Sequence, residues 1–317
     1  MKLTQITVLA FIFLAFFSAQ PALALTISPV RVEINGNPGQ TLRGEMEIFN
    51  EQADTKTFFS SFENFEPSGD TGSPKFVGNT GNLSTWIKTT ERIDITPGEK
   101  QVIPFTITIP ANAEPGGYFS AIFWGSQDPK TQQAGEVAIG GKLGVLVLLR
   151  VNGNIHEEAG LTEFATASSS RLFTSVPVSF SYRFTNKGDD RVVPLGDIVI
   201  KNTFGFEVEK IKANESEGNV LPNSSRKFHL IWGNEHQIAV GGFLSQAKSQ
   251  LSEFHFGLYR AQANIIWGSE NKIETASTWF VILPWQLLSI AAVALILLLF
   301  IVRRYNTWIV RRSATRQ

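Results

Sequence analysis

The feature that most constrains this chain is an uncharged apolar run from Val281 to Val302, near the C-terminus. As a helix, its 22 residues would extend ~33 Å, which is enough to cross a hydrocarbon core of ~30 Å. Trp285 lies near the start of the run, where an aromatic ring is favoured at a membrane interface. The run therefore predicts a transmembrane helix over residues 281–302. The alternative is a buried core helix, but the run has no amphipathic pattern.

Positive charge follows this run. Arg303 and Arg304 are the first of five arginines in the last 15 residues, which contain no acidic residue. The positive-inside rule then places residues 303–317 in the cytoplasm, as a short basic tail, and the chain before the run outside the cell. We predict that the lipid bilayer is one partner of this protein and that Trp285, Arg303 and Arg304 anchor the protein in it.

The N-terminus has the pattern of a secretory signal peptide. Lys2 precedes an apolar stretch from Ile6 to Phe17, and the small-x-small site Ala22-Leu23-Ala24 follows. We expect residues 1–24 to be removed by cleavage between Ala24 and Leu25. The alternative is an uncleaved N-terminal anchor. Together with the C-terminal span, this pattern predicts a single-pass type I protein of the cell membrane with an extracellular ectodomain.

The ectodomain between these segments is acidic and contains no cysteine. Residues 25–280 hold 22 basic and 28 acidic residues, a net charge of −6. The basic face that a nucleic-acid binder needs is therefore not visible. The lack of cysteine excludes disulfides, thiolate metal sites and a cysteine nucleophile. The core must instead come from aliphatic and aromatic side chains, and the chain has 25 Phe and 7 Trp to supply them.

Apolar residues in the ectodomain alternate with the period of two that a half-buried strand requires. Examples are the segments 30–34, 46–48, 102–108, 178–184 and 228–232. Lys142–Val151 is expected to be the last strand of a first domain, and only Gly241–Phe254 is compatible with a short helix. Four tryptophans at strand-like positions are expected in the cores, namely Trp86, Trp124, Trp232 and Trp267. The alternative is that their aromatic faces contact a sugar ring.

Three motifs occur twice, in the same order. They are a strand-ending Asn at Asn50 and Asn186, a Pro-containing turn at 96–98 and 221–224, and a Gly-x-Tyr strand start at 116–118 and 257–259. We therefore predict an all-β fold of two tandem immunoglobulin-like antiparallel β-sandwiches plus one C-terminal transmembrane helix. Domain one covers residues 25–153 and domain two residues 154–280, with the boundary between Val151 and Gly160.

Turn and core motifs of domain one resemble those of a known family. They are Ile27-Ser28-Pro29, Pro38-Gly39-Gln40-Thr41, Leu83-Ser84-Thr85-Trp86-Ile87 and Glu114-Pro115-Gly116-Gly117-Tyr118. In these motifs domain one is similar to the N-terminal domain of WxL-interacting cell-surface proteins, whereas domain two matches loosely. The resemblance implies an envelope-anchored protein that contacts peptidoglycan or a surface protein. Periplasmic pilus chaperones have a similar sandwich but lack a C-terminal span.

No residue pattern in the sequence predicts catalysis, a cofactor or a metal site, so we expect a protein that is not an enzyme. Ser-x-x-Lys occurs at 224–227 and 245–248, but the companion motifs of serine acyl-enzymes do not. The segment 135–142 departs from a phosphate loop by one residue, and the four histidines are scattered. Asp189-Asp190 and Glu215-Ser216-Glu217 are expected to be solvated turns rather than calcium loops.

The sequence favours binding or scaffolding at the cell envelope through domain one. Two long polar segments, Glu66–Asn82 and Gln127–Gly135, are expected to be exposed loops at or near the contact, with domain two mainly as a spacer. The alternative is a membrane-tethered assembly factor or chaperone-like protein that acts by edge-strand pairing. A long unpaired edge strand would favour this alternative, and an exposed aromatic or polar patch would favour glycan or protein binding.

Overall fold

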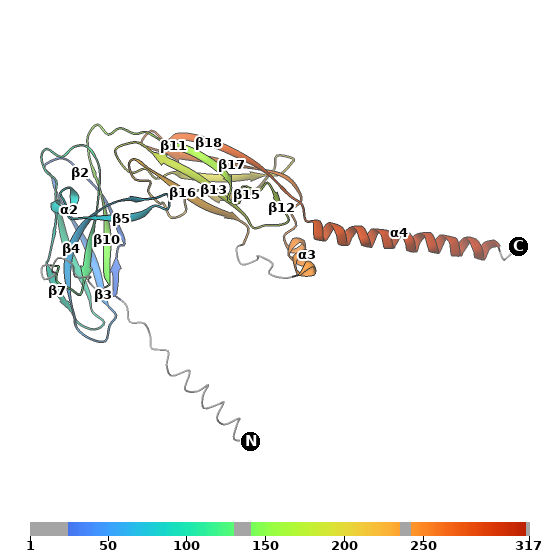
Figure 1. Cartoon of the computed structure of the whole chain (residues 1–317), viewed down its shortest axis with the longest axis horizontal. Helices are drawn as coiled ribbons and strands as arrows, with labels where there is room; N and C mark the ends of the chain where they lie inside the picture. Colours follow the sequence, from blue (N-terminus) through green and yellow to red (C-terminus); the bar gives the residue numbers. More distant parts are fainter. Residues whose placement is uncertain (1–24, 130–140, 235–241, 315–317) are drawn as a thin grey trace, which may run out of the picture. The chain divides into compact units, whose positions relative to one another are not determined.

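The computed structural model describes residues 25–129, 141–234 and 242–314. They form two compact units (Figure 1), each with its own hydrophobic core. Residues 67–73 and the residues from 156 onward make the second unit, and the rest of the described chain makes the first. Ala24 and the end of the segment Gln127–Gly135 lie outside the described residues, whereas Leu25 begins the first strand.

Unit one is a sandwich of two sheets. Its elements are β1 (Leu25–Ser28), β2 (Arg31–Gly36), β3 (Thr41–Asn50), β4 (Lys56–Ser68), β5 (Ser73–Gly78), α2 (Leu83–Trp86), β6 (Ile87–Thr89), β7 (Arg92–Ile95), β8 (Lys100–Thr108), β9 (Gly116–Gly125) and β10 (Lys142–Val151). One sheet has the order β1-β3-β8-β6, and the other has β2-β10-β9-β4-β5, with β7 paired to β4. Met46, Phe105 and Trp124 are buried between the sheets.

Unit two is a second sandwich, followed by a long helix. Its elements are β11 (Ala159–Thr166), β12 (Leu172–Phe173), β13 (Val178–Asn186), β14 (Leu195–Lys201), β15 (Glu207–Lys212), β16 (Ser224–Trp232), α3 (Phe243–Ser252), β17 (Gly257–Trp267), β18 (Lys272–Ile282) and α4 (Trp285–Ala314). The order β11-β13-β16 forms one sheet and β12-β18-β17-β14-β15 the other. Phe180, Tyr182 and Phe280 are buried in the core.

The predicted fold class is confirmed, including the strand Lys142–Val151 and the short helix near Gly241–Phe254. Most strand pairs are antiparallel, but β2 pairs with β10 and β12 with β18 in parallel. Trp124, Trp232 and Trp267 are buried as expected. Trp86 differs, because it ends the short helix α2, where its ring packs 4.7 Å from that of Tyr118.

Two segments differ from the sequence predictions. Most of Glu66–Asn82 is a hairpin rather than a loop, because β4 runs to Ser68 and β5 occupies Ser73–Gly78. Phe76 in β5 packs 4.8 Å from the ring of Phe123, which gives this hairpin an apolar contact. Val281 and Ile282 end β18 instead of starting the helix, because they pair with the first residues of β17.

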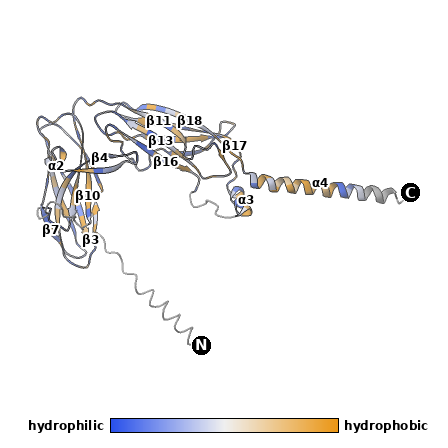
Figure 2. Ribbon diagram, in the orientation of Figure 1, coloured by the Kyte–Doolittle hydropathy of each residue, from blue (hydrophilic) through white to orange (hydrophobic). Residues whose placement is uncertain are grey.

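Helix α4 is the candidate membrane span. It is apolar over Trp285–Trp308, and almost none of this stretch is buried against the rest of the protein. Figure 2 shows α4 as hydrophobic along most of its length, with a hydrophilic stretch toward its C-terminal part. The helix continues through Arg303 and Arg304 to Ala314, so most of the predicted basic tail is helical.

Candidate functional site

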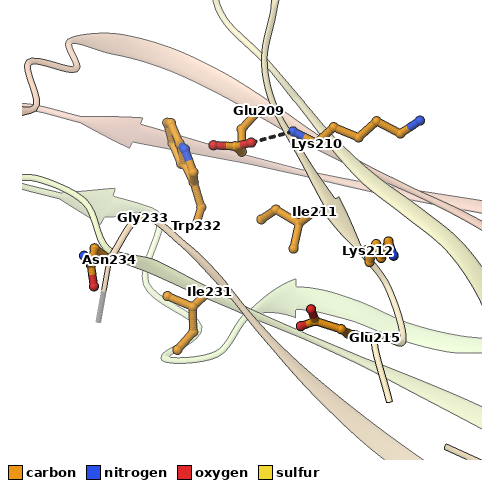
Figure 3. A pocket seen from close by; sticks show the side chains of 9 residues that line it. All are labelled: Glu209, Lys210, Ile211, Lys212, Glu215, Ile231, Trp232, Gly233 and Asn234. Carbon is orange, nitrogen blue, oxygen red and sulfur yellow. Dashed lines mark hydrogen bonds between the residues drawn. The ribbon is translucent and has the colours of Figure 1, made fainter. Parts of the chain in front are cut away.

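Two edge strands lie on the same side of the second sandwich. β16 ends the three-stranded sheet, and β15 ends the five-stranded sheet. An open groove separates them, with a cavity of about 570 Å³ at one place and about 520 Å³ at another. Residues 211, 212, 215 and 231 line both cavities, so the groove is continuous along the strands. Figure 3 shows the side chains around the larger cavity.

Backbone groups of β16 point toward this groove. The N–H of Lys227 donates to the carbonyl oxygen of Asp70 (2.7 Å) rather than to β13. In an antiparallel strand, alternate residues direct both their N–H and their C=O to the same side. The backbone groups of His229 and Ile231 therefore also point away from β13. Within the described parts of the chain, no strand pairs with this side of β16.

Asp70 occupies only the beginning of this edge. Residues 67–73 cluster with the second unit, and the Asp70 carboxylate accepts a hydrogen bond from the guanidinium of Arg183 (2.8 Å). The hydrogen bonds that Arg183 donates to the carboxylates of Asp70 and Glu163 raise the pKa of its guanidinium. The edge from His229 onward lies beyond this contact.

The base of the groove is apolar and its margins are charged. Phe228, Leu230 and Trp232 are buried on the core side of β16, and Ile211 packs against the same core. On β15, the Lys210 ammonium lies 3.0 Å from the carboxylate of Asp197, whose hydrogen bond raises the pKa of Lys210. Such a groove offers main-chain hydrogen bonds and an apolar surface to an extended segment of another chain.

His255 packs against one end of β16. Its ring lies 4.7 Å from that of Trp232 and 6.2 Å from that of Tyr259. Partial burial lowers the pKa of His255 despite the opposing field of Glu253, so the imidazole is neutral at neutral pH.

A second, shorter open edge lies in unit one. Among the described strands, Lys142–Val145 pair only with β9, whereas Leu146–Val151 pair with both β9 and β2. The N–H of Leu146 donates to the carbonyl oxygen of Val30, which shows that even-numbered residues of β10 direct their backbone groups to the β2 side. The backbone N–H and C=O groups of Lys142 and Gly144 therefore point to the side of β10 where β2 does not reach. This edge is four residues long, against five for the part of β16 that lies beyond the contact of Lys227 with Asp70.

The described residues assemble no catalytic group from the sequence candidates. Ser224 and Lys227 lie three apart on β16, so their side chains point to opposite faces of the sheet. His156 is exposed beside Glu158, and His236 and most of the segment 135–142 lie outside the described residues. Among described side chains, no group of three or more His, Asp or Glu could hold a metal ion.

One acidic turn was predicted wrongly. Asp190 is buried rather than solvated, with its carboxylate 3.5 Å from the guanidinium of Arg191. Strand β15 was not predicted either, although its sequence Glu207-Val208-Glu209-Lys210-Ile211-Lys212 has a pattern that could have indicated it. Charged residues interspersed along a strand are typical of an exposed sheet edge, because they discourage unwanted pairing.

Comparisons with known proteins identify no family. No family model matches the chain, and no curated protein does. Solved structures with a similar arrangement include the class 5 fimbriae chaperone CfaA, with 12% identity and a TM-score of 0.38 over 82% of this chain and 100% of that one. The E. coli chaperone DraB has 13% identity and a TM-score of 0.35 over 82% and 97%.

A further structure is the CsuC–CsuE chaperone–tip adhesin complex of Acinetobacter baumannii. Its matched chain has 12% identity and a TM-score of 0.35, over 80% of this chain and 97% of that one. Resemblance at this level concerns the arrangement of strands and does not transfer a function to this chain. The functional argument therefore depends on the groove itself.

Proposed function

We propose that this protein is a membrane-tethered assembly factor that binds an extended segment of a partner protein along the edge of β16. The observation that carries the proposal is the open edge itself, where the backbone groups of His229 and Ile231 face the groove between β15 and β16. A partner strand would gain main-chain hydrogen bonds there and would place alternate side chains toward the apolar base.

The composition of β16 supports this location. Its first half, Ser224–Lys227, is polar and charged, whereas Phe228–Trp232 is mostly apolar. Charge at a sheet edge opposes pairing, and its scarcity in the second half leaves that half suited to a partner. The specificity of binding would come from the side chains of Glu209, Lys212 and Glu215 along the margin.

The tether in this proposal is α4. The stretch Trp285–Trp308 has 24 residues, equivalent to ~36 Å of helix, which exceeds the ~30 Å of a hydrocarbon core. The arginines after Val302 favour a cytoplasmic C-terminus and an external groove. In this arrangement the partner is a protein of the cell envelope.

Binding of cell-wall glycan or a surface protein through loops of domain one has less support. Its first loop, Glu66–Asn82, contains the strand β5 and a tip that belongs to unit two. The second lies partly outside the described residues. The resemblance to WxL-interacting proteins therefore stands as a proposal for the envelope setting, and the experiment below separates the two functions.

The test uses a proline at the outward-facing position of β16. His229→Pro removes one N–H that points to the groove and leaves the β13 side intact, whereas His229→Ala keeps that N–H. A photo-crosslinking residue at Ser216, which is exposed and lines the groove, reports partner contact in intact cells. We expect a discrete protein adduct that persists in the His229→Ala background and falls several-fold with His229→Pro.

Two further variants locate the contact. Lys142→Pro, compared with Lys142→Ala, tests the shorter edge in unit one. Loss of the adduct with Lys142→Pro alone would move the site to β10. Sedimentation of the full-length protein with purified cell walls, unchanged by either proline, would instead favour wall binding and contradict the edge-pairing function.

A further inference from the structure

An unusual set of exposed apolar side chains lies at one end of the second sandwich. In the β14–β15 turn, Phe204 and Phe206 are 83% and 69% exposed. In α3, Leu244 and Leu251 are 74% and 65% exposed. Exposed apolar side chains gathered at one end of a domain are typical of a binding surface, because leaving them in water is unfavourable.

The strand register places the Phe204 turn at the end where α4 leaves the sandwich. The hydroxyl of Thr203 donates to the carbonyl oxygen of Leu258 (2.9 Å), and the N–H of Leu258 donates back to that hydroxyl (3.2 Å). Leu258 pairs with Val281 in β18, four residues before Trp285 begins α4. The turn is therefore about two strand spacings from the strand end that leads into α4.

Helix α3 is attached to the first residues of α4. The buried side chain of Gln250 bonds to that of Gln286, and its oxygen accepts the N–H of Leu287 (3.1 Å). Gln286 also bonds to Gln246, and the Phe243 ring packs 5.7 Å from that of Trp285. These contacts hold α3 beside the first turn of α4.

Three exposed residues of α3 share one face. Leu244, Lys248 and Leu251 follow the i, i+4, i+7 spacing of a single helical face, and the buried Ala247 and Gln250 lie along one side of it. Leucines on such a face suit the acyl boundary of a bilayer, and a lysine among them can extend its ammonium to the head groups. This face fits a lipid surface better than the surface of a folded protein.

We propose that α3 and the Phe204–Phe206 turn form an apolar collar near the first turn of α4, and that this collar inserts into the bilayer interface. The inference depends on the proposed membrane span, because Trp285 at the start of that span fixes the level of the collar. The occupant of this surface is lipid, and its effect is to hold the second sandwich directly on the membrane.

The chain has no cysteine, so single-cysteine labels can test the collar in the full-length protein. Phe204→Cys and Leu244→Cys would carry an environment-sensitive fluorophore in vesicles of zwitterionic and anionic phospholipid. Leu298→Cys reports on the span itself. Glu270→Cys is the matched control, because it lies in the β17–β18 turn at the other end of strands about 35 Å long.

We expect a nitroxide on the lipid acyl chain to quench the labels at 204, 244 and 298 several-fold more than the label at 270. Iodide in the aqueous phase should instead quench the label at 270 more than the labels at 204, 244 and 298. If the lipid-bound nitroxide quenches the label at 298 but the labels at 204 and 244 behave like the label at 270, the proposed collar is wrong and the proposed membrane span is supported. If 298 also behaves like 270, the proposed span fails and the collar fails with it.

Discussion

At the scale of single residues, two buried asparagines form the same structure in both sandwiches. The side-chain amide of Asn50 donates to the carbonyl oxygens of Asp54 and Ile95, and its oxygen accepts the N–H of Gln52. Asn186 donates to Asp190 and Val220 and accepts from Gly188. Both are fully buried, so each ties a strand end to the facing turn without exposed polar groups.

The turns in this structure are equivalent too. Ile95 and Val220 each lie three residues before a left-handed residue that follows proline, Gly98 with φ 71° and Asn223 with φ 52°. Glycine and asparagine tolerate that conformation better than other residues. The motif repeat in the sequence therefore reflects a repeated hydrogen-bond arrangement.

The first prediction concerns these asparagines. Asn186→Ala should lower the free energy of unfolding of unit two by about 3 kcal/mol, because each buried group left without a partner costs about 1–3 kcal/mol. Asn50→Ala should do the same to unit one. Asn79→Ala, at an exposed position, should stay within about 0.5 kcal/mol of the parent. Chemical denaturation measures all three, and equal stabilities would contradict the role of the buried amides.

At the scale of elements, the edges of unit two are distinguished by charge. β15 carries four charged residues among six, so its exposed backbone groups lie between side chains that discourage pairing. The second half of β16 lacks that protection and borders the groove. In the proposed function, two adjacent edges of different character would let one of them accept a partner selectively.

The link between α3 and α4 gives a prediction at this scale. Gln250→Ala removes the bonds to Gln286 and to the N–H of Leu287, so α3 should open more often. We expect hydrogen–deuterium exchange of α3 amides to accelerate several-fold. Lys248→Ala, at an exposed position of the same helix, should leave exchange unchanged. Equal exchange in the two variants would show that the glutamine contacts do not hold α3.

At the scale of the whole molecule, the sequences of the two chain ends predict on which side of the membrane the groove would operate. The sequence predicts a mature N-terminus at Leu25, which is also the first residue of β1. It also predicts that residues 25–280 lie outside the cell and the arginines after Val302 inside.

N-terminal sequencing of the membrane-bound protein should therefore find Leu25. Protease added to intact cells should remove the sandwiches and leave a membrane-protected fragment that contains α4. Lysed cells provide the control, in which the C-terminal residues also become accessible. A Met1 N-terminus would disprove cleavage, and protection of residues 25–280 in intact cells would reverse the orientation.

The sequence by itself determined the properties that depend on neighbouring residues. Period-two alternation indicates half-buried strands, and a long uncharged run indicates a span, because both patterns follow from local geometry and solvent preference. The duplicated motifs at Asn50 and Asn186 were visible for the same reason, since each turn needs particular residues at fixed positions. The all-β class, the two sandwiches and the position of β10 followed from these patterns.

Only the tertiary structure decided which strands are edges. Whether β16 has a neighbour on its groove side depends on pairing between segments far apart in the chain, so the sequence of β16 alone does not predict it. The same holds for Asp190, which looks like a solvated turn residue until Arg191 and the surrounding chain bury it. The groove and the proposed collar at α4 likewise combine residues that are distant in the chain, because burial and hydrogen-bond pairing are properties of the packed chain.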